Sequence, residues 1–223
     1  MEVNTMWWAM PALLYDNNTV EDAALINAVP LTAQSKYIIK HLVIYSTVKL
    51  VLDAYSIDDL FDAVDKKCLN NQLLAHRAVF VSMFCNNQLR GCIGETDAYE
   101  PLWQNIIRFC MHSTRSDPRF DALEADELAN THFTVSVLSD LKQVVAINQQ
   151  TLLTQLQVGI DGLVLDDGKK RAVFLPCVWS HFKHEQDFIT ELLKKGEWQA
   201  TKWPQHLTGE RFTVETVTGS ILS

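Results

Sequence analysis

The sequence predicts an α+β fold with a mainly antiparallel sheet. Two extended apolar runs flank Asn86-Asn87, and a second pair flanks residues 166–169, as strands do in hairpins. Segments with apolar residues at helical spacing lie between these hairpins, but strands and helices do not alternate regularly. Hairpins mixed with helices, without repeated βαβ units, are typical of α+β proteins.

Length and composition limit the class of protein. A chain of 223 residues with 48% hydrophobic and 21% charged residues can form one large domain or two small subdomains. Its net charge of -8 makes nucleic-acid binding unfavourable, because an acidic surface repels phosphate backbones. Five cysteines without a CxxC pair do not suggest a disulfide framework, so we expect a reducing compartment, the cytoplasm.

The start of the chain differs from the rest. We expect residues 1–35 to form an irregular, apolar N-terminal tail and residues 36–223 to form the domain. The apolar run from Met6 to Tyr15 has no preceding Lys or Arg, which a signal peptide needs. It is also shorter than the roughly 18 apolar residues that cross a bilayer, so no membrane segment is expected.

The first elements follow from apolar spacing. Helical periodicity from Lys36 to about Ala54 predicts a long helix, and residues 57–69 predict a shorter one. Residues 78–85 and 88–93 are expected to pair antiparallel through a turn at Asn86-Asn87, because Asn tolerates positive φ.

Pairing outward from that turn without irregularity places Val81 opposite Cys92 and Met83 opposite Arg90. Strand side chains alternate between faces, so these four residues are expected to share one face.

A helix is expected to begin at Pro101 and to end at Asp117-Pro118. Its expected inward residues are Leu102, Ile106, Phe109, Cys110 and Ser113. The remaining expected elements are a strand at 133–138, a short helix at 151–156, a hairpin of 163–165 with 172–175, a helix at 187–195 that Gly196 ends, and one last strand through Phe212, Val214 and Thr216.

Cys92 is the candidate catalytic residue. Gly91 and Gly94 lie in the same strand, where glycine often marks a bulge or the close approach of a ligand or another segment. Arg90 two residues away would place a cation near the thiol. The opposing interpretation is a packed, inert thiol with Arg90 bound to a carboxylate.

A second candidate segment is Asp117-Pro118-Arg119-Phe120. Asp117 and Arg119 can anchor the turn to each other, or Arg119 can bind an anion. We favour the anchor. His181 and His184 imply no third metal ligand, so we expect no metal and no cofactor.

Five motifs in order resemble the AMMECR family across about residues 38 to 215. They are Leu89-Arg90-Gly91-Cys92-Ile93-Gly94, Asp117-Pro118-Arg119-Phe120, Val135-Ser136-Val137-Leu138-Ser139, Gly159-Ile160-Asp161-Gly162-Leu163, and Phe174-Leu175-Pro176 with Val178-Trp179. The resemblance implies an α+β fold of two unequal lobes and no settled biochemical activity. It also implies an association with a Memo-like protein and a radical-SAM enzyme. The site residues that it implies are Arg90, Gly91, Cys92, Ile93, Gly94, Asp117 and Arg119.

Two hypotheses for function stay open. In the first, the chain is a binding or regulatory module that takes a partner segment or small ligand beside Arg90 and Cys92. In the second, it is a thiol-dependent enzyme that modifies RNA or a small molecule, with Cys92 as nucleophile. The sequence favours the first because it offers no evident base for the thiol.

Overall fold

The computed structural model describes residues 26–27, 29–199 and 203–222, so most of the expected N-terminal tail lies outside the described residues. The chain divides into two compact units. The first contains the described residues up to Val137 and those from Glu215 onward, and the second is Leu138–Val214. Among the described residues, the strands form two four-stranded sheets, one with the order β2-β1-β3-β8 and one with the order β4-β7-β5-β6.

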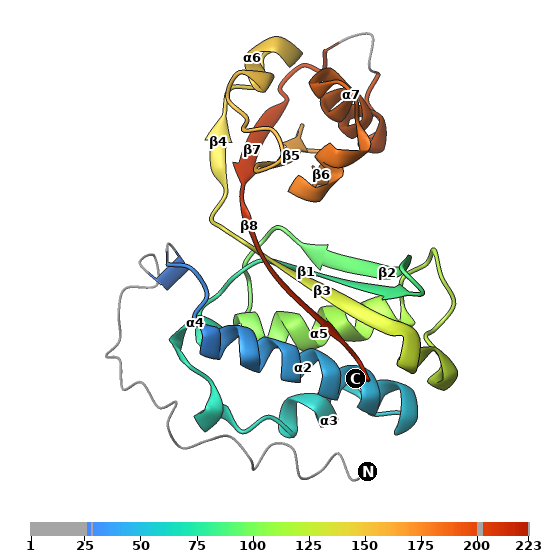
Figure 1. The fold of residues 1–223 in the computed structure, drawn as a ribbon. Helices are drawn as coiled ribbons and strands as arrows, with labels where there is room; N and C mark the ends of the chain where they lie inside the picture. The colour runs from blue at the N-terminus through green and yellow to red at the C-terminus, as the bar shows by residue number, and fades with distance from the viewer. Residues whose placement is uncertain (1–25, 28, 200–202, 223) are drawn as a thin grey trace. The chain divides into compact units, whose positions relative to one another are not determined.

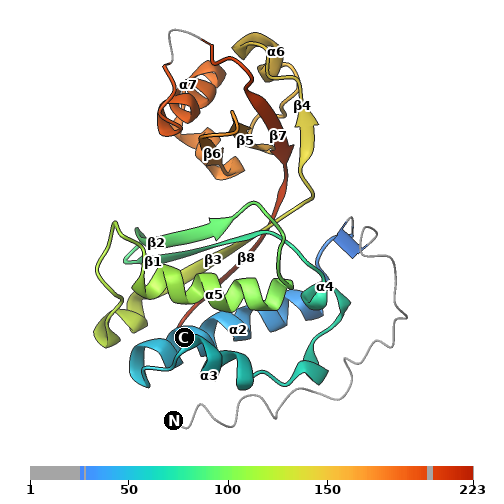
Figure 2. The same cartoon turned by 180° about the vertical axis from the view of Figure 1, so that it is seen from behind.

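The first unit is a sheet with helices on one face (Figure 1; Figure 2 gives the view from behind). Its central strand β1 pairs antiparallel with both β2 and β3. Helix α5 packs against β1 and β2, and α2 packs against α5. Its elements are α2 (Ala33–Leu52), α3 (Ile57–Asp62), the 3₁₀ helix η3 (Lys66–Cys68), α4 (Asn71–Leu74), β1 (Val79–Cys85), β2 (Gln88–Glu95), α5 (Leu102–Arg115), the 3₁₀ helix η4 (Ala125–Asn130), β3 (Thr131–Leu138) and β8 (Val214–Ser220).

Local sequence explains where the two long helices begin and end. The Thr32 side chain accepts a hydrogen bond from the Ser35 amide and caps α2, which therefore begins three residues before the predicted Lys36. Pro101 precedes α5 directly, and the helix ends just before Asp117. The predicted inward residues of α5 are all buried, which confirms its orientation: Leu102, Ile106, Phe109, Cys110 and Ser113.

The predicted turn of the first hairpin is confirmed. Asn86 and Asn87 have φ angles of 51° and 62°, the left-handed conformation that Asn tolerates better than most residues. The hairpin joins β1 to β2, as expected, but the register of these strands departs from the prediction at Arg90, as described below.

The second unit is a smaller sheet with its own core. Trp179 stacks on Phe188 of α7, with ring centroids 3.6 Å apart and an interplanar angle of 2°. Gly196 follows α7, as predicted. The elements are β4 (Lys142–Val144), α6 (Gln149–Leu153), β5 (Gly162–Asp166), β6 (Arg171–Phe174), the 3₁₀ helix η5 (Pro176–His181), α7 (Glu185–Lys195) and β7 (Thr208–Phe212).

The prediction of one last strand through Phe212 and Thr216 is wrong. The segment is two strands, interrupted at Thr213, and β7 and β8 belong to different sheets. Phe212 is buried in the second unit, whereas Val217 is the buried residue of β8 and Thr216 is exposed. The buried positions therefore change phase at the break, since Phe212 in β7 and Val217 in β8 are five residues apart.

Among the residues that the structure describes, no helix is long and apolar enough to cross a membrane.

Candidate functional site

A β-bulge at Arg90 determines where the Cys92 side chain lies. The strands pair as predicted beside the turn, but Arg90 has no partner in β1 and the register shifts by one residue. Cys92 consequently lies opposite Ser82, and the predicted pairing with Val81 is wrong. Val81 and Met83 are fully buried in the core, so Cys92 lies on the other face of the sheet.

Arg90 binds the segment that follows α5. Its Nε donates to Glu127 Oε1 at 2.7 Å and its Nη2 donates to Glu127 Oε2 at 3.0 Å. The same guanidinium donates to the carbonyl oxygens of Asp121 and Ala122. The hydrogen bond from Arg90 lowers the pKa of Glu127. The cation that was expected to act on the thiol is therefore paired with a carboxylate, as the packed interpretation of Cys92 requires.

Asp117 and Arg119 bind the backbone of Cys92. Asp117 Oδ2 accepts from the Cys92 amide at 2.9 Å, and Arg119 Nη2 donates to the Cys92 carbonyl at 2.9 Å. β2 is an edge strand, so the pair satisfies backbone groups that a neighbouring strand would otherwise bind. The hydrogen bond from Arg119 is the main reason why the pKa of Asp117 falls to about 2. The anchoring role predicted for these two residues fits this geometry.

The Cys92 thiol has a hydroxyl partner. The Ser82 hydroxyl donates to Cys92 Sγ at 3.0 Å, and the cysteine is half-buried. His132 is stacked on Phe84, with ring centroids 5.0 Å apart, and burial lowers the pKa of His112. In the described part of the chain, neither histidine hydrogen-bonds the thiol. Within the described residues, the thiol thus has a hydrogen-bond donor but no hydrogen-bonded general base.

Gly91 and Gly94 are sites of close approach within the protein itself. A Cβ added at Gly91 would collide with the backbone carbonyl of Ser113 in α5. A Cβ added at Gly94 would collide with the backbone of Val79 and Phe80. Both glycines are therefore explained by packing against the chain's own backbone, without a ligand.

Ser113 connects α5 to the hairpin. Its hydroxyl donates to the Val81 carbonyl at 2.7 Å and accepts from the Ile93 amide at 3.1 Å. The hydroxyl thus bridges backbone groups of two strands at the point where Gly91 lets the helix come closest. This contact holds α5 against the motif strand.

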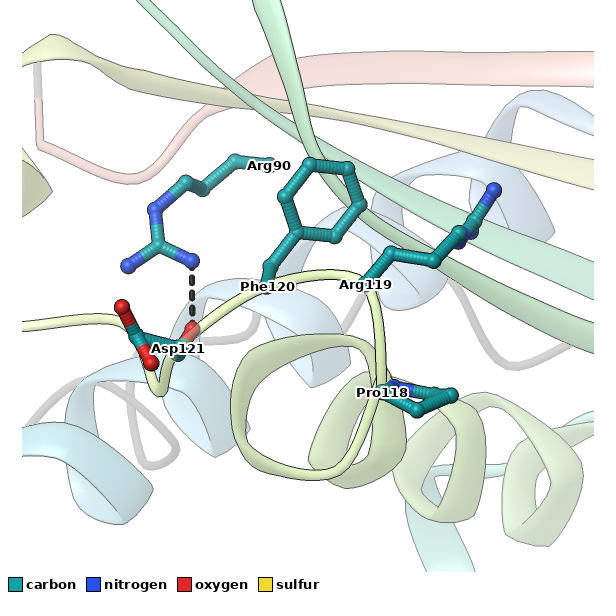
Figure 3. A pocket seen from close by; sticks show the side chains of 5 residues that line it. All are labelled: Arg90, Pro118, Arg119, Phe120 and Asp121. Atoms are coloured by element: carbon teal, nitrogen blue, oxygen red, sulfur yellow. Dashed lines mark hydrogen bonds between the residues drawn. The ribbon is translucent and has the colours of Figure 1, made fainter.

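A hollow of about 430 Å³ opens beside β2 (Figure 3). In the figure the Phe120 ring lies between Arg90 and Arg119, and the two guanidinium groups extend to opposite sides of it. The Arg119 guanidinium carbon lies 5.4 Å from the Phe120 ring centroid, and 55% of the Arg119 side chain is exposed. The lining residues are Arg90, Pro118, Arg119, Phe120 and Asp121.

The structure therefore brings Arg90, Cys92, Asp117 and Arg119 together, but these residues have different roles. Arg90 and Arg119 line the hollow, whereas Asp117 is buried and the two glycines serve packing.

Three residues that contact the site were not predicted to do so: Ser82, Ser113 and Glu127. Phe120 lies in the predicted second segment, but no separate role was expected for its ring. Ser82 and Ser113 carry no motif that could have identified them. Glu127 does have a local signal, because it follows Glu124 by three residues in a capping box at the start of η4.

The later motifs stabilise the second unit. Trp179 donates through Nε1 to the carbonyl oxygen of Asp161 at 2.7 Å. The buried Asp161 carboxylate accepts from the Gln157 amide at 2.8 Å and from Arg211 at 3.2 Å. The fourth and fifth motifs thus bind each other, and their contacts are structural.

His181 and His184 are close in the sequence but lie at the ends of two different elements. His181 ends η5 and His184 precedes α7. Within residues 26–27, 29–199 and 203–222, no group of three or more His, Cys, Asp or Glu side chains could hold a metal ion.

The chain is similar to known proteins. The model of the family described as AMMECR1 matches residues 50–217. Protein TV1384 of Thermoplasma volcanium is 33% identical over 121 residues, which are 53% of this chain and 60% of that protein. Protein SSO0193 of Saccharolobus solfataricus is 29% identical over 158 residues, 70% of each chain. The chain spans a little over half of the length of several archaeal relatives that it matches, such as Protein Ta0236 of Thermoplasma acidophilum at 58%.

A solved structure shares the fold. The uncharacterized protein PH0010 from Pyrococcus horikoshii superimposes with a TM-score of 0.71 and 22% sequence identity. The match covers 82% of this chain and 90% of that one.

Proposed function

Because the chain belongs to the AMMECR1 family, whose matched relatives have no established activity, we propose that it is a binding module. In this proposal, the hollow beside β2 takes a segment of a partner protein or a small ligand. A Memo-like protein and a radical-SAM enzyme are the proposed partners. The proposed compartment is the cytoplasm, which the absence of a disulfide among the five cysteines supports.

One observation carries the proposal: a half-exposed arginine and an aromatic ring stand side by side at a hollow. Arg119 is held by Asp117 and by the Cys92 carbonyl, so its orientation is set before any ligand arrives. Arginine and aromatic side chains contribute most of the binding energy in many interfaces. A preorganised donor also loses little conformational entropy on binding.

The alternative is a thiol-dependent enzyme with Cys92 as nucleophile. The observation in its favour is the Ser82 hydroxyl, whose donated hydrogen bond would stabilise a thiolate. Two observations oppose this alternative. In the described part of the chain no base lies beside the thiol, and the positive charge of Arg90 is paired with Glu127. A thiol nucleophile ordinarily needs a base or an uncompensated cation nearby.

The proposal can be tested by partner capture from an extract of the source organism. We expect Phe120→Ala to lose a partner that the unchanged chain retains, because the variant removes the ring at the hollow. Tyr99→Ala is the matched control, since Tyr99 is an aromatic residue of the same unit with 72% exposure that does not line the hollow. Thermal unfolding of each variant establishes that it is folded.

Cys92→Ser separates the two functions in the same experiment. A binding module keeps its partner after this substitution, because the hydrogen bonds from the Cys92 backbone to Asp117 and Arg119 remain. Equal capture by the unchanged chain and Phe120→Ala would contradict the proposal. If the unchanged chain captures a substrate fragment covalently and Cys92→Ser does not, the chain is a thiol-dependent enzyme.

A further inference from the structure

The two arginines at the hollow have N–H groups that donate no hydrogen bond to an oxygen of the described residues. A guanidinium carries five N–H groups. Arg119 uses one on Nε and two on Nη2, for Asp117 and the Cys92 carbonyl, which leaves both N–H groups of Nη1. Among the described residues, the guanidinium also interacts with the Cys92 side chain, but no hydrogen bond joins Nη1 to an oxygen acceptor. This end of Arg119 can therefore donate to a ligand.

Arg90 has fewer N–H groups available to a ligand. It uses four of its five N–H groups, on Glu127 and on the carbonyl oxygens of Asp121 and Ala122. One N–H of Nη1 remains within the described part of the chain, and only 19% of the side chain is exposed. The donors available to a ligand thus lie on both sides of the Phe120 ring, with more of them at Arg119 (Figure 3).

The charges around the hollow do not favour an anion. Asp117 lies 2.7 Å from Arg119 and Glu127 lies 2.7 Å from Arg90, so each guanidinium faces a carboxylate. The side chain of Asp121 is exposed at the hollow and adds a further negative charge. Two more exposed acids follow in the same segment, Glu124 and Asp126. An approaching phosphate or carboxylate would meet a region of net negative charge.

We infer that the ligand of the hollow is an extended, basic polypeptide segment of a partner protein. Its neutral backbone carbonyls accept from the free N–H groups of Arg119 and Arg90, an apolar side chain covers Phe120, and a Lys or Arg faces Asp121. Neutral acceptors suit donors whose charge is already compensated, and the basic side chain complements the acidic rim. This inference rests on the proposed function and specifies its ligand class.

The test uses the full chain labelled with ¹⁵N and three probes. They are the blocked peptides acetyl-Gly-Lys-Leu-Gly-amide and acetyl-Gly-Glu-Leu-Gly-amide, and inorganic phosphate. Titrations at low ionic strength follow the backbone amide signals of residues 119–122 and the side-chain Nε signals of the two arginines. We expect the lysine peptide to shift these signals with an affinity at least about fivefold higher than the glutamate peptide, and phosphate to leave them unchanged.

Variants make the test specific. Asp121→Asn should remove most of the preference for the lysine peptide, because it neutralises the rim but keeps the backbone carbonyl that Arg90 binds. Glu185→Gln, an exposed acid on α7 of the second unit, should leave the preference unchanged.

Stronger shifts with phosphate or with the glutamate peptide would overturn the inference and leave the proposed binding function standing. The absence of shifts with either peptide would also overturn it. The capture experiment with Phe120→Ala decides the proposed function separately.

Discussion

Replacing Asp117 by Asn should destabilise the protein in a pH-dependent manner. The buried carboxylate accepts from the backbone and side chain of Arg119 and from the Cys92 amide, and these bonds lower its pKa from 3.8 to about 2. A group with a lowered pKa stabilises the folded state above its unfolded pKa, and the stabilisation is lost as pH falls through the folded pKa.

The lowering of the Asp117 pKa from 3.8 to about 2 corresponds to roughly 2.4 kcal/mol at pH 7. The same relation leaves about half of this at pH 3 and almost none below pH 2. Asp117→Asn should therefore lower the free energy of unfolding by about 2.4 kcal/mol at neutral pH. The difference from the unchanged chain should shrink as the pH approaches 3.

Urea unfolding at pH 7, 5 and 3, followed by tryptophan fluorescence, measures this difference. Asp62→Asn is the control, because Asp62 is an exposed acid of the same unit on α3 and should change stability by less than about 0.5 kcal/mol. A loss for Asp117→Asn that is the same at pH 7 and pH 3 would show that ionisation of Asp117 is not its cause. A loss at pH 7 no larger than that of the control would show that the Asp117 contacts do not stabilise the fold.

Three further outcomes are expected. Gly91→Ala should cost about 3 kcal/mol or more in urea unfolding, because its Cβ meets the Ser113 carbonyl, whereas Gly168→Ala should cost about 1 kcal/mol, from its positive φ alone. Iodoacetamide labelling from pH 6 to 9, read by mass spectrometry, should leave Cys110 unmodified in the folded protein, because burial raises its pKa to about 12, while the exposed Cys177 reacts. Elemental analysis after dialysis should find no stoichiometric metal, and about one zinc or iron per chain would contradict this expectation.

The same labelling experiment tests the thiol hypothesis. Cys92 is expected to react more slowly than Cys177 if it is a packed residue, since it is half-buried and Arg90 is paired with Glu127. Faster labelling of Cys92 than of Cys177 at pH 7 would favour the enzyme.

Sequence alone determined the fold class and many of the elements, although the predicted last strand is two strands and the helix predicted at 57–69 is α3 followed by η3. The Asn86-Asn87 turn, the inward residues of α5 and the end of α7 at Gly196 all follow from local chemistry, and each is confirmed. The segments that form the site were also identified, because Arg90, Cys92, Asp117 and Arg119 lie within recognisable motifs. Local signals suffice there, since turn and cap preferences depend on a few neighbouring residues.

Only the tertiary structure decided how these residues face one another. The bulge at Arg90 adds one unpaired residue to β2 and so moves Cys92 from the core face to the face of Ser82. A period-two pattern cannot reveal such an insertion when both faces of a strand are apolar. The contacts of Arg90 with Glu127 and of Asp117 with the Cys92 amide join residues 37 and 25 positions apart. Such contacts arise from the packing of whole elements. The sequence suggested that Arg90 activates the thiol, whereas in the structure Arg90 binds the segment beside the hollow.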